Sequence, residues 1–385
     1  AIEPPGQFDM QIQQVRAEDL QSEAQKTIQE PFDLLQGPLF RARLLCASPQ
    51  EHALVLVLHH INSDGWSMGI LGRELVALYE GANLAPLEWQ YADYASWQRT
   101  HLGESLLDRQ LSYWRERLHE LPPLLGLPTD FRRPATQKLN GSIAYRVLPG
   151  ELYAGLEGLA RSHGATLFMT VLSVFTVLLG RYTGQSDIVV GTPVSGRQRQ
   201  ELENIVGLFV NTLVLRTDLS GDPTFVELLQ RVKANLSADY GHQDLPLERL
   251  VRELNPERHL DRHPLYQVAF ALQNIARPDF RFPGMQVDPL GLELHRTELD
   301  LDVHVWESPQ GLELMAVYCT DLFEAATIER FLQHFQGLLE SVLAQPEATL
   351  SSLRLESQQL AVKAAPAHPS DSWIALFARQ VRRTP

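Results

Sequence analysis

The residues with the clearest chemical potential in this sequence are 59–65, which read HHINSDG. They place two imidazoles and one carboxylate close together, directly after an apolar run at residues 53–58. That run is typical of a strand covered on both faces. Because side chains alternate across a strand, His59 and His60 should point in opposite directions. We therefore expect one histidine to take part in chemistry and the other to support the structure.

The residues after this motif predict a turn and a helix that could stabilise negative charge. Gly65 lets the backbone turn sharply or approach a ligand closely. Residues 66–79 have the spacing of an amphipathic helix, with Leu71, Leu75 and Leu78 expected along its buried stripe. Free N–H groups at the start of such a helix suit a developing oxyanion. Strand, histidine, glycine turn and helix together indicate acyl transfer.

Four interpretations of the motif are open on these residues alone. The histidines could be hydrogen-bonded core residues. His59, His60 and Asp64 could bind a metal, but adjacent strand histidines diverge and no further cluster with ligand spacing follows. A hydrolase triad would need a nucleophile on a G-x-S-x-G elbow, and the sequence has none. In direct transfer, His60 would handle the proton of a nucleophile that attacks an activated acyl group.

Composition limits the class of protein and its partners. A chain of 385 residues with 44% hydrophobic content is long enough for two domains or lobes. Its net charge of −14 argues against nucleic acid as the main partner, and no basic run indicates a membrane surface. Cys46 and Cys319 are too few for a disulfide framework, and no apolar run reaches membrane-spanning length. We therefore expect a cytoplasmic protein.

The order of the predicted elements is mixed α/β. We expect an N-terminal lobe at 1–120, an extended connection at 121–140 and a C-terminal lobe at 141–355. Residues 356–370 have the composition of a linker, and a new segment follows at 371–385. Periodicity in the C-terminal lobe predicts strands at 142–148, 188–191, 208–216, 265–273, 292–295, 302–306 and 312–318, and helices at 166–182, 224–240 and 326–343.

A second helical stretch is expected before residue 120. It carries Tyr94, Trp97, Leu102, Leu106, Tyr113 and Trp114. The helical spacing of Tyr91, Tyr94 and Trp97 favours packing over chemistry for these aromatic side chains. We therefore assign them to the structure of the N-terminal lobe.

Five ordered motifs resemble those of condensation domains of nonribosomal peptide synthetases, a family similar in fold to chloramphenicol acetyltransferase. Residues 59–65 are similar to its HHxxxDG motif. The other four are 91–98 (YADYASWQ, similar to YxDYAxWQ), 188–197 (IVVGTPVSGR, similar to GTPVxGR), 207–212 (GLFVNT, similar to GxFVNT) and 242–246 (HQDLP, similar to HQDxP). The resemblance implies a two-lobed α/β fold with mixed sheets and an active-site tunnel between the lobes.

The resemblance also implies a reaction. The amine of a carrier-bound acceptor aminoacyl group would attack the thioester of a carrier-bound donor aminoacyl or peptidyl group, forming a peptide bond. Upstream donor and downstream acceptor carrier domains would supply both groups on phosphopantetheine arms, and the domain itself would bind no cofactor or metal. Residues 63–67 are similar to domains that join an L donor to an L acceptor. Heterocyclisation domains replace the histidines with aspartates, and epimerisation domains differ after the motif.

Site residues carry over at matching positions. His60 is expected to act on the proton, with the Gly65 N–H at the oxyanion and His59 in support. Arg197 is a permanent cation, and we predict an ion pair between Arg197 and Asp64 that shapes the site. Candidates for tunnel lining are Trp66, Ser67, Asn211 and His242.

Two departures from the family pattern concern the ends of the chain. The family's RHExLRTxF segment has no counterpart before residue 30, so we expect the start of the first lobe to be absent, leaving an open strand edge. Residues 373–385 resemble the entry to an adenylation domain, which favours a multidomain parent. The alternative functions are a stand-alone coenzyme A-dependent acyltransferase and a non-catalytic docking or degenerate domain.

Overall fold

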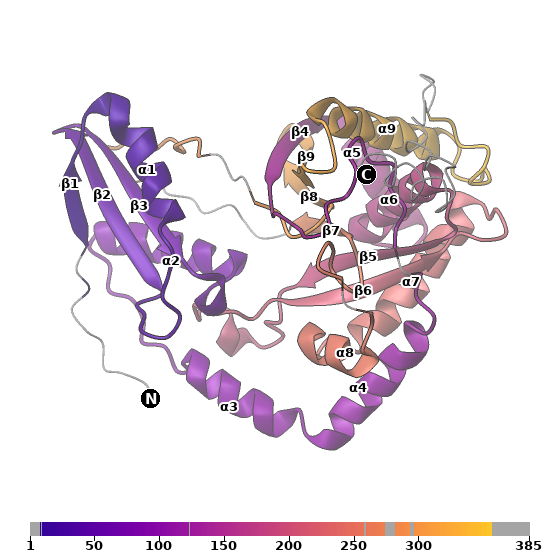
Figure 1. The fold of residues 1–385 in the computed structure, drawn as a ribbon, viewed down its shortest axis with the longest axis horizontal. Helices are drawn as coiled ribbons and strands as arrows, with labels where there is room; N and C mark the ends of the chain where they lie inside the picture. The colour runs from indigo at the N-terminus through magenta and orange to yellow at the C-terminus, as the bar shows by residue number, and fades with distance from the viewer. Residues whose placement is uncertain are drawn as a thin grey trace, which may run out of the picture.

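The protein forms two lobes, each built on its own β-sheet, in a computed structural model (Figure 1). The structure describes residues 8, 10–122, 124–257, 259–273, 282–292 and 296–355. The predicted linker at 356–370, the adenylation-like segment at 371–385 and most of the strand expected at 292–295 lie outside the described residues.

The first lobe contains a three-stranded sheet in the order β1-β2-β3. β1 (Gln11–Gln14) pairs in parallel with β2 (Phe40–Ser48), and β2 pairs antiparallel with β3 (Glu51–Leu58). Helix α1 (Leu20–Gln29) packs on one face of the sheet (Figure 1). The buried core between them is small and consists of Leu20, Ala24, Leu45 and Val55.

β3 carries the apolar run, but the prediction that it is covered on both faces is wrong. Val55 is its only buried residue, and Leu54 keeps 42% of its surface exposed. Among the described residues, β2 is the only strand paired with β3, so β3 is an edge strand. A short apolar run is compatible with either position, because sequence periodicity does not record what covers a strand.

Helix α2 (Gly65–Tyr79) follows the histidine motif as predicted, but a different face of it is buried. The buried residues are Ser67, Ile70 and Gly72, whereas Leu78 is 53% exposed. At the start of this face, Ser67 donates a hydrogen bond to the backbone carbonyl of Gly207, which belongs to the second lobe. The predicted leucine stripe is therefore wrong for Leu78.

Helices α3 (Tyr91–His101) and α4 (Glu104–Arg117) lie end to end and lead from the first lobe to the second (Figure 1). The predicted helical stretch is thus interrupted between them. Although α4 falls within the range expected for the N-terminal lobe, its residues Leu111 and Trp114 are buried in the core of the second lobe. Trp114 also donates a hydrogen bond from Nε1 to the carbonyl of His242, at 2.9 Å.

The second lobe contains a six-stranded mixed sheet in the order β4-β9-β8-β7-β5-β6. Its pairs are antiparallel except for β5 with β7 and β7 with β8, which are parallel. The strands are β4 (Gly141–Pro149), β5 (Asp187–Val194), β6 (Asn211–Asp218), β7 (Val268–Gln273), β8 (Leu301–Ser308) and β9 (Gly311–Cys319). Two mixed sheets confirm the predicted mixed α/β class.

Helices of the second lobe pack against this sheet, and the long ones cover one of its faces (Figure 1). They are α5 (Gly150–Ser162), α6 (Leu167–Thr183), α7 (Phe225–Tyr240), α8 (Leu247–Leu254) and α9 (Ala325–Ala344). The predictions at 166–182, 224–240 and 326–343 are confirmed by α6, α7 and α9. α6 is the most buried of these helices; Thr166 caps its start, and it ends at Gly184 in the left-handed conformation, at a φ of 70°.

The length and hydropathy of each helix can be compared with what a membrane span requires. No single helix of the described ranges is long and apolar enough to cross a membrane. Helices α5 and α6 meet the criterion only when they are taken together, and this pair is bent by 105°.

Candidate active site

The two lobes share a cavity of about 1670 Å³. The histidine motif contributes to it from the first lobe, and α3 forms another part of its wall. The second lobe contributes the segment between β5 and β6, the start of α8 and the face of the sheet that the long helices leave open. Representative lining residues are His60, Trp97, Asn211, Asp244, His263 and His304.

The two motif histidines have different surroundings. β3 ends at Leu58, and a 3-10 turn at His60–Asn62 follows it. His59 caps this turn, because its Nδ1 accepts a hydrogen bond from the Ile61 N–H at 3.0 Å. Its ring also meets the edge of Phe32, with ring centroids 6.1 Å apart. The side chain of His60, by contrast, is exposed and lines the cavity.

The predicted ion pair between Asp64 and Arg197 is confirmed. Arg197 donates from Nη1 to Asp64 Oδ2 at 2.6 Å and from Nη2 to Oδ1 at 3.1 Å, a bidentate arrangement. Asp64 also caps α2 by accepting from the Ser67 N–H and hydroxyl, at 2.9 and 2.8 Å. The Phe209 N–H is a fifth donor, at 3.0 Å. Both charged side chains are almost fully buried, with 3% and 1% exposed.

The balance of burial and hydrogen bonding fixes the charge of Asp64. Burial alone would raise the pKa of this carboxyl, because a low-dielectric environment disfavours the charged form. The hydrogen bonds from Arg197, Phe209 and Ser67 outweigh burial and hold the pKa of Asp64 below its ordinary value. Asp64 is therefore a carboxylate at neutral pH, with its oxygens already occupied by donors.

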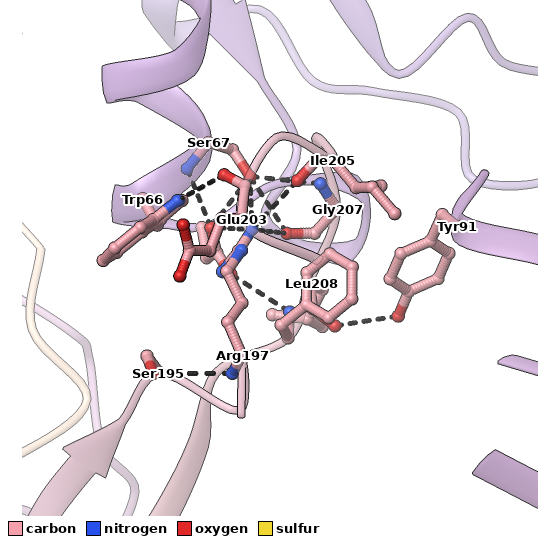
Figure 2. Close-up of polar contacts among 11 residues, drawn as sticks. Trp66, Ser67, Tyr91, Ser195, Arg197, Glu203, Ile205, Gly207 and Leu208 are labelled. Carbon is pink, nitrogen blue, oxygen red and sulfur yellow. Dashed lines mark hydrogen bonds and ion pairs between the residues drawn. The ribbon is translucent and has the colours of Figure 1, made fainter. Parts of the chain in front are cut away.

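Arg197 connects the first lobe to the loop between β5 and β6. Its Nη2 donates to the carbonyls of Ile205 and Gly207, at 3.2 and 3.4 Å. The guanidinium also lies over the ring of Phe209, 4.2 Å from the centroid. Figure 2 shows Arg197 at the centre of these contacts, between the residues of α2 and the 203–208 segment. β6 begins at Asn211, later than predicted, because this segment reaches to the first lobe.

Trp66 and Ser67, predicted as tunnel lining, are not among the residues that line the cavity. Trp66 Nε1 donates to the Glu203 carbonyl at 2.8 Å (Figure 2). The Ser67 hydroxyl donates to the Gly207 carbonyl at 3.0 Å and accepts from the Gly207 N–H at 3.1 Å. Both side chains therefore bind the 203–208 segment and contribute to the junction between the lobes.

Two glycines in the matched motifs allow this close approach. Gly196 has a φ of +64°, and a Cβ there would lie 2.0 Å from the Phe209 carbonyl oxygen. A Cβ on Gly207 would lie 2.2 Å from the ring of Tyr91. That tyrosine donates from its hydroxyl to the Leu208 carbonyl at 2.8 Å (Figure 2). Tyr91 thus packs, as expected, and also lines the cavity.

Gly65 is the first residue of α2, and its backbone is exposed. Two later N–H groups of the first turn have acceptors: Ser67 donates to the Asp64 side chain, and Met68 donates to the Asp64 carbonyl at 3.4 Å. Within the described part of the chain, the Gly65 N–H has no acceptor. A free N–H at a helix N-terminus can stabilise an anion.

Asn211 lines the cavity and holds the loop before α8. Its Nδ2 donates to the carbonyls of Gln243 and Leu245, both at 2.9 Å. Its Oδ1 accepts from the Leu247 N–H at 3.1 Å. The amide thus uses both its donors and its acceptor on one loop, which links the GLFVNT and HQDLP motifs.

His242 is not among the cavity-lining residues, because its ring stacks on Tyr113 with centroids 3.9 Å apart. Asp244 of the same motif lines the cavity instead. It accepts hydrogen bonds from Gln198 at 2.9 Å and Gln110 at 3.0 Å. Sequence analysis did not identify Gln110, a buried residue of α4, since it lies in no motif and α4 was expected to belong to the first lobe.

The two lobes, their mixed sheets and the shared cavity with its histidine turn define the chloramphenicol acetyltransferase-like class of fold. Residues 7–361 match the family model described as Condensation domain. The chain belongs to the condensation-domain family.

Proteins similar in sequence include two components of linear gramicidin synthase from Brevibacillus parabrevis. One is 47% identical over 337 residues, which cover 86% of this chain and 4% of that protein. The other is 44% identical over 388 residues, which cover 96% of this chain and 8% of that protein. The chain therefore spans less than a tenth of the length of either relative.

Solved structures show the same fold. The X-domain from teicoplanin biosynthesis has a TM-score of 0.84 and 29% identity, covering 92% of this chain and 83% of that one. A four-domain nonribosomal peptide synthetase bound to AMP and glycine has a TM-score of 0.79 and 27% identity, covering 91% of this chain and 28% of that one.

Proposed function

We propose that this chain forms peptide bonds in nonribosomal peptide synthesis, joining two acyl groups held on carrier domains. One observation carries the proposal: His60 lines a cavity that both lobes build, at the turn that leads into the N-terminus of α2. Membership of the condensation-domain family supports the same reaction. The acceptor amine attacks the donor thioester, and the donor carrier's thiol leaves.

Proton handling is the step that needs a side chain. An α-amino group with a pKa of about 8 is mostly protonated at neutral pH, and attack requires the neutral amine. In our proposal the His60 imidazole accepts the proton that the nitrogen loses and returns it to the departing thiolate. The donor thioester is already activated, so no nucleophilic serine or cysteine is required.

The remaining site residues are assigned positioning and electrostatic roles. The Gly65 N–H stabilises the oxyanion of the tetrahedral intermediate, because helix N-termini favour negative charge. His59 fixes the turn that presents His60, and the Asp64–Arg197 pair fixes the start of α2. Two tethered reactants also gain from a high effective concentration.

The relatives are much longer proteins, which supports partner domains in the same assembly. We propose that upstream donor and downstream acceptor carrier domains deliver both substrates on phosphopantetheine arms, and that an adenylation domain follows in the same polypeptide. We assign an L donor and an L acceptor from residues 63–67. A cytoplasmic location is supported by Cys46 and Cys319, which are buried free thiols, as expected in a reducing compartment.

The proposal is tested by mixing the chain with a donor and an acceptor carrier, each loaded with an amino acid, and measuring the dipeptidyl thioester by mass spectrometry. We expect product with the native chain and a rate about 10²- to 10⁴-fold lower for His60→Ala, the range typical of a lost general base. His119→Ala is the matched control, because that histidine is 73% exposed and does not line the cavity.

Other outcomes would contradict parts of this proposal. A full rate for His60→Ala would exclude the catalytic role of His60. Product formed only from an acyl-coenzyme A and a free alcohol would identify the stand-alone acyltransferase. No product from any loaded pair would support a non-catalytic docking domain.

A further inference from the structure

A second polar pair lies in the cavity, on the open face of the second-lobe sheet. Asp302 and His304 are alternate residues of β8, so their side chains share one face. His304 Nε2 lies 3.0 Å from Asp302 Oδ2, and the side chains of His304 and Asp302 are 19% and 28% exposed, respectively. Both line the same cavity as His60. Neither belongs to a motif identified in the sequence.

The hydrogen bonds of His304 determine which atom of the pair is available to a ligand. Gln273 Nε2 lies 3.0 Å from His304 Nδ1. An amide nitrogen can only donate, so Nδ1 accepts and the ring proton lies on Nε2, directed at Asp302. Both ring nitrogens are then occupied. The pair carries the negative charge of Asp302, and Oδ1 of that carboxylate has no partner within the described ranges.

Apolar side chains lie beside this carboxylate. Val317 on β9 is directly opposite Asp302 in the sheet register, and Ile143 on β4 is opposite Val317. Met315 is opposite His304. All three apolar residues line the cavity, and directly opposite side chains in a sheet lie about 5 Å apart. The wall thus combines one carboxylate with a strip of alkyl surface.

No fixed cation of the described residues neutralises Asp302. Arg199, Arg252 and Arg296 also line the cavity, but among the described residues none of them forms an ion pair with Asp302. Glu298 adds a further negative charge on the segment that carries Arg296. Burial lowers the pKa of His263 to about 4, so this cavity-lining histidine is neutral at pH 7. A carboxylate in a partly enclosed site, with no cation paired to it, favours a cationic ligand.

We propose that Asp302, oriented by His304, binds the cationic end of an amino-acid side chain on one of the two acyl groups, while Val317, Met315 and Ile143 contact its alkyl stem. The substrate class is a basic amino acid with a straight stem, such as lysine or ornithine. The inference rests on the proposed peptide-bond formation and names the side chain it accepts. His304 is a positioning residue, and Asp302 is the residue that touches substrate.

The test compares lysine with norleucine, which has the same alkyl stem and lacks the charge. Each is loaded in turn on the donor and on the acceptor carrier, opposite a common partner amino acid, and kcat/KM for dipeptide formation is measured. We expect the native chain to prefer lysine about 10- to 100-fold at one of the two positions, as for a charged hydrogen bond. Asp302→Asn should reduce this preference below about threefold.

Glu307→Gln is the matched control. It removes the same charge from the same strand at an exposed position that does not line the cavity, and its lysine preference should equal that of the native chain. His304→Leu should weaken the preference less than Asp302→Asn does, because it leaves the carboxylate in place. A variant that fails to fold would lose kcat/KM for both amino acids, whereas the inference predicts a change in the ratio of the two kcat/KM values.

Equal rates for lysine and norleucine at both positions would overturn the inference, as would a lysine preference that survives in Asp302→Asn. Failure of the proposed function gives a different result, namely no peptide from either amino acid. The subsite is then tested by calorimetry with lysyl and norleucyl amides of a pantetheine analogue that carries an amine in place of its thiol. Tighter binding of the lysyl amide that Asp302→Asn abolishes supports the subsite, and equal binding overturns it.

Discussion

Asp64 lies in the motif that first draws attention to catalysis, yet its bonding excludes it from proton transfer. Its two oxygens accept five hydrogen bonds, from Arg197, Ser67 and Phe209. A carboxylate with its lone pairs engaged and its pKa lowered is a poor proton acceptor. His60 lines the cavity, and in our proposal it is the motif residue that exchanges a proton with substrate.

Asp64→Asn should destabilise the protein by about 3–5 kcal/mol at pH 7, because it leaves the buried Arg197 guanidinium without its counter-charge. Urea unfolding provides the measurement. The matched control is Asp187→Asn, which breaks the pair with Arg216; those side chains are 35% and 22% exposed, so the loss should be below about 1 kcal/mol.

The pH dependence of this difference has a defined sign. The folded pKa of Asp64 lies below its unfolded value, so the ion pair contributes fully above about pH 4 and its contribution is lost as the pH falls further. The difference in free energy of unfolding between the native chain and Asp64→Asn should be roughly constant from about pH 8 to about pH 5 and should become smaller below about pH 4. A difference that becomes larger in acid would contradict this explanation.

At the scale of elements, the loop between β5 and β6 joins the lobes. It brings Arg197, Gly207 and Phe209 to the N-terminus of α2. Where two parts of this loop approach each other most closely, there is no room for a Cβ atom. Gly196 lies at that point, with a φ of +64° and the Phe209 carbonyl oxygen next to its missing Cβ.

Gly196→Ala should lower the melting temperature more than Gly184→Ala does. Both glycines have positive φ, at 64° and 70°, so both substitutions carry the conformational cost of about 1–2 kcal/mol. Only Gly196 adds a backbone contact at 2.0 Å, whereas Gly184 has nothing within 4 Å. Equal losses of melting temperature would show that the loop adjusts freely at Gly196.

At the scale of the whole molecule, the two lobes have cores of very different size. The first-lobe sheet buries Leu20, Ala24, Leu45 and Val55, whereas the second-lobe sheet buries a continuous core with α4, α5, α6, α7 and α9. Buried apolar area provides most of the stability of a lobe. The first lobe should therefore open more readily than the second.

Hydrogen exchange measured by mass spectrometry should show this difference. Amides of β3 should exchange faster than those of β8, which is paired on both sides and has Leu301, Val303 and Val305 buried. Val55→Ala should accelerate exchange in β3 and leave β8 unchanged, because Val55 belongs to the small core. Acceleration in both strands would show that the two lobes unfold together.

The sequence by itself determined the mixed α/β class, the family and the long helices α6, α7 and α9, because these depend on ordered motifs and on strong local periodicity. It also predicted the Asp64–Arg197 pair, since two of the motifs supply a carboxylate and a permanent cation. Helix α5 was missed because Gly155 and Gly158 lower its helix propensity, although Leu152, Leu156 and Ala160 form its buried stripe.

Only the tertiary structure decided what covers each face and which polar atoms meet. It left β3 at an edge, placed α4 in the second core and directed Trp66 and Ser67 to the lobe junction. Asp302 and His304 came together on the cavity wall in the same way. These arrangements depend on contacts between segments far apart in the chain, and the local periodicity of a sequence does not predict such contacts.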